Sequence, residues 1–188
     1  MLDTGFSFGG ASGTRLRERI MQWHERLTGS RFLRGVNTVG GVTKDIVADT
    51  AQALLKDLQN IQKDFREFVD ISEDSASLLN RLEGAGQLDY QIAVDHGVLG
   101  IAGRALGLAS DSRVDFPYAA YNKIKFSISL EKDGDVRSRL YVRIKEIFAS
   151  FGIIEQALAS LPANGKLVSE GKVELRKNSY GVGSAEGW

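Results

Sequence analysis

Residues 134–161 read GDVRSRLYVRIKEIFASFGIIEQALASL, and this stretch decides the fold. Its apolar side chains recur at gaps of four or three positions, which places them on one face of a helix. This face consists of Val136, Leu140, Ile144, Ile147, Phe151, Ile154, Leu158 and Leu161. Asp133 or Asp135 can cap the start, and Pro162 cannot continue the helix. The spacing therefore predicts a long helix from about Asp133 to Ser160.

Two further helices are predicted upstream from the same periodicity. One runs from about Asp45, its expected N-cap, to Val69, and the other from about Thr14 to Thr28, with Gly29 as its C-cap. Their apolar faces comprise Val47, Ala51, Leu54, Leu58, Ile61, Phe65 and Phe68 in the first helix, and Leu16, Ile20, Trp23 and Leu27 in the second. Such faces are buried against one another, so we expect a helical bundle, with a dimeric coiled coil as the alternative.

Shorter elements are expected between and after these helices. Helical segments are predicted at Ser75–Leu82 and Leu88–Asp95. Alternation of apolar and polar residues predicts a strand at Lys125–Leu130, and Lys172–Leu175 is a second candidate. The expected fold class is therefore mainly α, a helical bundle with a small β element.

The chain is expected to form a single domain over residues 1–188. Its helical core spans about residues 12–162, and residues 163–188 form a Gly-rich tail. Both ends look cut, so we expect an internal fragment of a longer subunit.

Composition argues against several functional classes. The 24 basic and 24 acidic residues leave no net charge, unlike a typical nucleic-acid-binding protein. The sequence has no cysteine, which removes disulfides, thiolate metal ligands and cysteine nucleophiles. It has no run of about 18 apolar residues that could span a membrane. His24 and His96 lack metal-ligand spacing, so neither a metal site nor a catalytic residue is predicted in this chain.

Arg104 is the strongest single candidate for a functional residue. It lies in an otherwise apolar, Gly-rich stretch from Val98 to Leu108. An arginine there needs an acceptor or must face outward, because burying an unpaired charge is costly. Two roles remain open: a structural pair with a carboxylate, or a fixed positive charge beside a redox centre, whose potential it would raise.

Charged residues in two places form a candidate structural site or partner interface. Asp111 and Arg113 can pair within one tight loop. The second group, at spacings of four, four and three along the long helix, comprises Asp135, Arg139, Arg143 and Glu146. Such spacing favours a salt-bridged, solvated helix face, and the same face is also where another subunit could dock.

Four motifs, in order, resemble one known family. The segment 134–147 is similar to the G-D-x-x-x-R-x-x-x-R-x-x-E helix of the hydrogenase-like large subunit of respiratory complex I and of energy-converting and formate-hydrogenlyase-type nickel–iron hydrogenases. Residues 27–45 resemble L-T-G-x-R followed by G-G-V-x-x-D. Residues 97–107 resemble G-x-x-G-x-x-x-R-A-S-G, and residues 111–121 resemble D-x-R-x-x-x-P-Y-x-x-Y.

The resemblance implies the middle portion of that large subunit. In the hydrogenases, two cysteine pairs outside the matched region bind nickel and iron, so the parent protein has a possible nickel–iron centre while this chain holds no cofactor. In complex I, which oxidises NADH, the corresponding cavity binds quinone. Arg104 matches an arginine that lies near the iron–sulfur cluster of the small partner subunit.

Partners implied by the resemblance are the small iron–sulfur subunit and other subunits of the complex. No nucleic acid is expected, and the membrane is reached only through partner subunits, which implies a cytoplasmic location peripheral to the inner membrane. The expected function is a scaffold in a hydrogenase-like or NADH:quinone oxidoreductase-like electron-transfer complex, with no catalysis by this fragment alone. The alternative is a helical assembly domain without a redox role.

Overall fold

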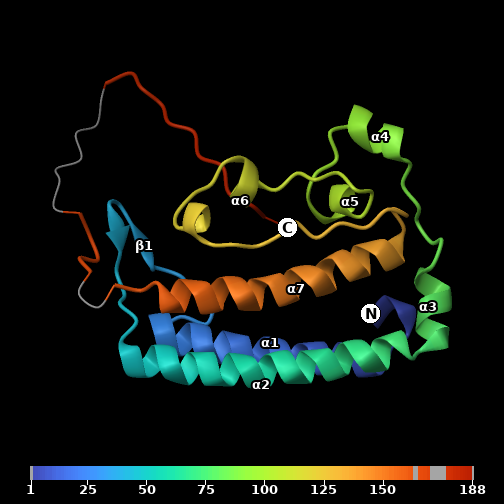
Figure 1. The fold of residues 1–188 in the computed structure, drawn as a ribbon, viewed down its shortest axis with the longest axis horizontal. Helices are drawn as coiled ribbons and strands as arrows, with labels where there is room; N and C mark the ends of the chain where they lie inside the picture. The colour runs from blue at the N-terminus through green and yellow to red at the C-terminus, as the bar shows by residue number, and fades with distance from the viewer. Residues whose placement is uncertain (1, 163–164, 170–176, 188) are drawn as a thin grey trace.

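Three long helices lie side by side and supply most of the buried core (Figure 1). They are α1 (Ser7–Thr28), α2 (Ala48–Glu73) and α7 (Val136–Ala159). The protein is described by a computed structural model that covers residues 2–162, 165–169 and 177–187. The predicted class, a mainly helical bundle with a small β element, is confirmed. Among the described helices, none combines the length and the apolar character that a membrane crossing requires.

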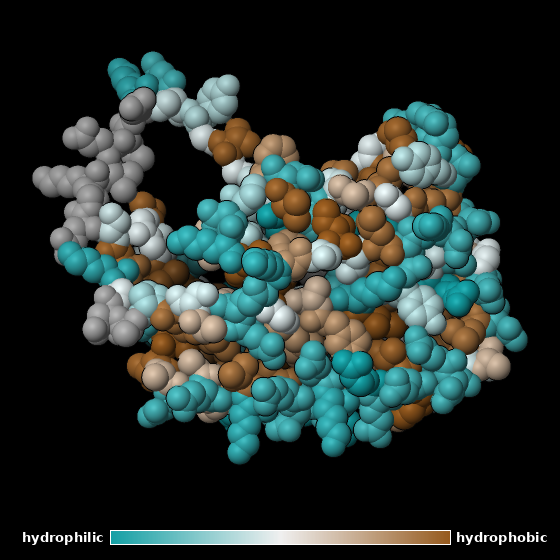
Figure 2. All heavy atoms as spheres, viewed as in Figure 1, coloured by the Kyte–Doolittle hydropathy of each residue, from teal (hydrophilic) through white to brown (hydrophobic). Residues whose placement is uncertain are grey.

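The α1–α2 contact follows the predicted apolar faces. Leu54, Leu58, Ile61, Phe65 and Phe68 of α2 pack with α1 residues Leu16 and Trp23, with Ile20 and Leu27 half-buried beside them. This burial is the main stabilising term, at roughly 25 cal/mol for each Å² of apolar surface removed from water. Hydrophilic side chains cover the outward side of α2 (Figure 2).

A polar clamp also joins α1 and α2. Asp57 accepts hydrogen bonds from Trp23 Nε1 at 2.6 Å and from Arg19 Nη2 at 2.5 Å, and the other Arg19 terminal nitrogen reaches Asp64 at 2.7 Å. Burial alone would raise the pKa of Asp57, but the bonds from Trp23 and Arg19 lower it below its usual value.

Helix α7 is buried on two sides, which the single predicted face did not anticipate. Ile144 and Phe151 pack into the α1–α2 core, whereas Val142 packs with Ile101 and Ala105 in a layer on the other side. Ile147, Ile154 and Leu161, all predicted to be buried, are 38%, 36% and 43% exposed. The prediction was wrong here because a central helix needs two apolar faces, and one stripe describes only one of them.

That second layer comprises short elements that lie over α7 (Figure 1). They are α4 (Tyr90–Asp95), α5 (Gly100–Arg104), α6 (Ser112–Asp115) and the 3-10 turn η2 (Tyr121–Lys123). Helix α3 (Ala76–Leu82) lies at the end of the bundle and contacts α2 and α7 (Figure 1). A further 3-10 turn, η1 (Leu2–Thr4), precedes α1. The predicted segments at 75–82 and 88–95 correspond to α3 and α4, which Ser75 and Asp89 cap with their side chains.

The small β element lies at the end of the bundle. Strands β1 (Asn37–Thr38) and β2 (Gly41–Val42) form an antiparallel hairpin, and Val168 bridges to Gly41. The predicted strand at 125–130 is absent from this described region. At its first residue Gln156 of α7 takes the place of a strand partner, since it accepts from Lys125 N–H and donates to Lys125 C=O. The candidate at 172–175 lies outside the described residues.

Helix starts also differ from their predicted positions. Helix α1 begins at Ser7 instead of Thr14, because Phe6 packs on the core and Gly9 is buried. Val47 occupies the N-cap position of α2, so the prediction of Asp45 was wrong; Asp45 accepts from the neighbouring Ile46 N–H. For α7 the structure decides between the two candidates, since Asp135 accepts from Ser138 N–H at 2.7 Å.

Candidate functional site

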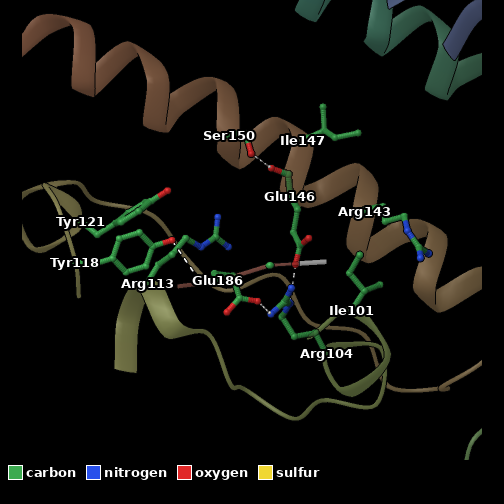
Figure 3. A pocket seen from close by; sticks show the side chains of 11 residues that line it. Ile101, Arg104, Arg113, Tyr118, Tyr121, Arg143, Glu146, Ile147, Ser150 and Glu186 are labelled. Atoms are coloured by element: carbon green, nitrogen blue, oxygen red, sulfur yellow. Dashed lines mark hydrogen bonds and ion pairs between the residues drawn. The ribbon is translucent and has the colours of Figure 1, made fainter. Parts of the chain in front are cut away.

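A cavity of about 280 Å³ lies between α7 and the layer that carries α5 and α6 (Figure 3). Its wall combines cationic, acidic and aromatic groups with two isoleucines. The lining residues are Ile101, Arg104, Arg113, Tyr118, Tyr121, Arg143, Glu146, Ile147, Ser150, Glu186 and Gly187. The residues predicted at three separate places in the sequence, 104, 113 and 143–146, therefore meet at one site.

Arg104 is held at the inner end of this cavity with 2% of its side chain exposed. It is the last residue of α5, and the preceding Gly103 allows a tight approach, since a Cβ there would lie 2.7 Å from the Val98 carbonyl oxygen. Its Nε lies 2.6 Å from Glu146 Oε1 and its Nη1 lies 2.8 Å from Glu186 Oε1. Nη1 also donates to the Ser110 carbonyl at 3.1 Å. The predicted carboxylate partner is thus confirmed, and there are two.

The two contacts differ in kind. Arg104 Nη1 and Glu186 make an aligned hydrogen bond, whereas the Nε contact with Glu146 is an ion pair whose direction does not meet hydrogen-bond geometry. The ion pair is strongly attractive all the same, because opposite charges 2.6 Å apart in a buried site attract whatever the N–H angle. One guanidinium facing two carboxylates leaves an excess of one negative charge in this group.

Asp111 and Arg113 form a second, self-contained pair beside Arg104. Asp111 is 1% exposed and caps α6, and Arg113 holds both of its oxygens, through Nε at 2.9 Å and Nη2 at 2.6 Å. Burial alone would raise the pKa of Asp111, but the Arg113 bonds and the charge of Arg104 lower it below the usual range. The hydrogen bonds that Arg113 donates to Asp111 likewise raise the pKa of Arg113. The predicted pairing is confirmed.

An aromatic wall completes the site. The rings of Tyr118 and Tyr121 pack edge to face, with their centroids 5.0 Å apart. The guanidinium carbon of Arg113 lies 4.9 Å from the centroid of the Phe126 ring. Burial raises the pKa of Tyr121, and the neighbouring Tyr118 adds to the rise. The raised pKa keeps the Tyr121 phenol neutral at neutral pH, as a hydrogen-bonding group.

The four residues predicted to form a charged helix face, Asp135, Arg139, Arg143 and Glu146, do not pair with one another in the part of the chain that the structure describes. The prediction of a salt-bridged face was therefore wrong. Asp135 is buried and binds Ser138 N–H and Gly84 N–H. Arg139 donates to the carbonyls of Gly134 and Gly86, and Arg143 donates to the Arg139 carbonyl from an exposed position. Glu146 turns to Arg104 instead. Glu146 pairs with Arg104 and not with a neighbour on its own helix, because an ion pair in a buried site is stronger than one on an exposed helix face.

Sequence reasoning missed Glu186 as a site residue. Its two oxygens accept from Arg104 Nη1 and from Ser112 N–H, each at 2.8 Å, and its own N–H points to the Tyr118 hydroxyl at 3.3 Å. Residues 104 and 186 are 82 positions apart, so no local pattern relates them. The available signal was chemical: an isolated arginine in an apolar stretch needs a carboxylate from somewhere.

The donor set does not suit a nickel–iron centre. Nickel and iron of the hydrogenase type are bound by thiolates, and this chain has no cysteine. Within the described residues, no group of three or more His, Asp or Glu side chains is placed to hold a metal ion. The donors of the site bind a carboxylate of the chain itself, since Arg104 Nη1 and the Ser112 N–H both donate to Glu186.

Comparisons with known proteins extend over nearly the whole chain. Formate hydrogenlyase subunit 5 of Escherichia coli (strain K12) is 34% identical over 183 residues, which are 97% of this chain and 32% of that protein. An NADH-quinone oxidoreductase subunit of Thermosipho melanesiensis is 34% identical over 170 residues, covering 89% of this chain and 46% of that protein.

One solved structure has the same fold. A polypeptide of the membrane-bound sulfane sulfur reductase, an archaeal respiratory membrane complex, matches with a TM-score of 0.78 and 32% identity over 88% of this chain and 46% of that one. This chain thus spans about a third to a half of the length of these relatives. The family of the respiratory-chain NADH dehydrogenase 49 Kd subunit matches residues 3–186, and the chain therefore belongs to that family.

Proposed function

We propose that this chain is a component of a membrane-associated electron-transfer complex of the hydrogenase or NADH:quinone oxidoreductase type. In that role α1, α2 and α7 form a scaffold around the active-site region, and the layer with α5 and α6 faces an iron–sulfur subunit. The chain reaches the membrane only through other subunits. Because it contributes no cysteine, any nickel–iron centre depends on residues outside this chain, and the chain alone does not catalyse redox chemistry.

The observation that carries the proposal is the family match over residues 3–186. It is supported by relatives named as subunits of formate hydrogenlyase and NADH-quinone oxidoreductase, and by a solved relative from a respiratory membrane complex. The cavity also supports a position beside another subunit, because its partly apolar wall carries three arginines and two glutamates.

The proposed neighbour role of Arg104 takes a modified form. Two carboxylates lie within ion-pair distance of its guanidinium, so the three groups together carry one negative charge. Such a group would lower the potential of a nearby iron–sulfur cluster, whereas an unpaired arginine would raise it. The direction of the shift in the cluster potential therefore depends on Glu146 and Glu186 as much as on Arg104.

Co-purification tests the partner. The chain is co-expressed with the small iron–sulfur subunit encoded in the same genome, and the tagged chain is recovered at moderate salt. Arg143→Glu reverses an exposed charge at the cavity rim and is expected to reduce recovery of the subunit, because rim charges steer association. Lys56→Glu makes the same charge change on the exposed face of α2 and should leave recovery unchanged.

Two outcomes would count against the proposal. Failure of the unaltered chain to retain the iron–sulfur subunit would remove the proposed contact. Retention of the subunit with an unchanged cluster midpoint potential in Glu186→Gln would favour the alternative, a helical assembly domain without a redox role.

A further inference from the structure

Residues 177–187 place one half-buried side chain against the body of the protein. Glu186 is that side chain, and the other ten residues of this segment are exposed, with Tyr180 at 94% and Val182 at 90%. In Figure 3 the Glu186 carboxylate points inward to Arg104, while its main chain passes Tyr118. The hydrogen bonds of Glu186 therefore define an anchor site for this segment.

The anchor site binds both the side-chain carboxylate of Glu186 and its backbone N–H. Arg104 Nη1 binds one carboxylate oxygen and Ser112 N–H binds the other, both at 2.8 Å. The Tyr118 hydroxyl accepts from the backbone N–H of the same residue at 3.3 Å. A free carboxylate would satisfy the first two groups and leave the third unused.

The site is also organised before Glu186 arrives. Arg104 is fixed by Glu146 and by the Ser110 carbonyl, neither of which belongs to the segment. Fixing a long cationic side chain in advance lowers the entropic cost of binding. The Glu146 carboxylate close by also disfavours a doubly charged ligand such as phosphate, because like charges repel in a buried site.

The geometry points to a binding site for a peptide-borne glutamate, formed by Arg104, the Ser112 N–H and the Tyr118 hydroxyl, which the chain's own Glu186 fills and which accepts another glutamyl peptide when Glu186 is removed. Because Glu186 and Gly187 line the 280 Å³ cavity, filling the site also closes part of the cavity wall. This recognition goes beyond the proposed membership of an electron-transfer complex and does not depend on it.

The test uses the full chain with Glu186→Ala and the probe N-acetyl-glutamate α-amide, measured by titration calorimetry and thermal shift. The variant is expected to bind the probe in the millimolar range and to gain thermal stability. The unaltered chain should bind it about twofold or more weakly, because its tethered Glu186 competes at a millimolar effective concentration, comparable to the dissociation constant of the probe. N-acetyl-glutamine α-amide and inorganic phosphate should bind neither protein. Glu83→Ala, at an exposed ion pair with Arg137, is the matched control and should behave like the unaltered chain.

Second substitutions in the Glu186→Ala background assign the donors without disturbing Arg104. Ser112→Pro removes the N–H at the first position of α6, where proline fits, since Asp111 before it is extended at φ −152° and ψ 116°. It is expected to weaken the probe roughly tenfold, the loss of one charge-assisted hydrogen bond. Tyr118→Phe should weaken N-acetyl-glutamate α-amide and leave the weaker binding of propionate unchanged. Equal binding of the glutamate and glutamine probes, or no difference between Glu186→Ala and the unaltered chain, would overturn the inference.

Discussion

At the scale of single residues, the buried charges of this protein are each matched by a partner fixed in the fold. Arg104 faces Glu146 and Glu186, and Asp111 holds Arg113 through both carboxylate oxygens. Burying such groups is favourable only while the partner is present, because desolvation is not recovered by a lone charge. Substitutions of one partner are therefore expected to cost far more than exposed ion pairs would.

Asp111→Asn tests this at the α6 pair. The variant loses the charge-assisted bond to Arg113 Nη2, and we expect a loss of about 2–3 kcal/mol in the free energy of unfolding at pH 7. Urea denaturation measures it. Asp70→Asn, at an exposed position on α2, is the control and should change stability by less than about 0.5 kcal/mol.

The same substitution changes the pH dependence. The pKa of Asp111 is lower in the folded protein than in the unfolded chain, so its stabilising contribution is complete above about pH 4, the ordinary aspartate pKa. It is lost as the pH falls from there through the lowered folded pKa. Between about pH 5 and about pH 2.5, the free energy of unfolding of the unaltered protein should therefore fall further than that of Asp111→Asn. Parallel pH profiles would contradict this assignment.

At the scale of elements, the start of α7 depends on one aspartate that also ties down a distant loop. Asp135 binds Ser138 N–H within the helix and Gly84 N–H from the loop after α3, at 2.7 and 2.8 Å. Asp135→Ala is expected to cost about 2 kcal/mol, the upper end for an N-cap, since two N–H groups lose their acceptor. Asp133→Ala, at the exposed aspartate two positions earlier, should cost almost nothing. Equal effects in thermal unfolding would mean that Asp135 is not the cap.

The β hairpin requires glycine at position 41. A Cβ there would lie 2.0 Å from the Leu167 carbonyl oxygen, which accepts from Val42 N–H. Gly41→Ala should therefore separate residues 167–169 from the hairpin and increase amide exchange at Val42. Gly13→Ala places the same methyl in open space on α1 and should stabilise the protein by about 0.5–1 kcal/mol. Unchanged protection of Val42 in Gly41→Ala would refute the steric argument.

At the scale of the whole molecule, α7 joins two packing layers. Its residues Ile144 and Phe151 belong to the α1–α2 core, and Val142, at 0% exposure, belongs to the α5 layer. A helix shared in this way couples the layers, because neither keeps its buried surface if α7 moves. Unfolding is therefore expected to be a single transition.

Two core truncations test this coupling. Leu58→Ala in the α1–α2 core and Val142→Ala in the α5 layer should lower the stability of the whole protein, by about 3 and about 2 kcal/mol respectively, with unchanged denaturant slope. Val47→Ala, at an exposed position, is the control. A separate early transition in Val142→Ala, followed by circular dichroism and amide exchange, would show that the α5 layer unfolds alone.

The sequence by itself determined the long helices and the class of fold. The apolar spacing on α2 names residues that the structure buries from Leu54 to Phe68, because helical periodicity depends on neighbours three and four positions apart. The same spacing also named Val47, which is 60% exposed at the N-cap. The Asp111–Arg113 pair could also be predicted, because the two residues are only two positions apart in the sequence. Arg104 was identified from its apolar surroundings, together with its need for a carboxylate.

Only the tertiary structure decided which carboxylates pair with Arg104. Glu146 was read as part of a helix face, and Glu186 lies 82 residues from Arg104, so their meeting depends on how α7, α5 and the chain near 186 pack together. The second buried side of α7 and the contacts of Gln156 with the backbone of Lys125 arise in the same way. Local spacing sets which residues share a face of one element, whereas the partner of a buried charge is chosen by three-dimensional proximity and the cost of leaving it unpaired.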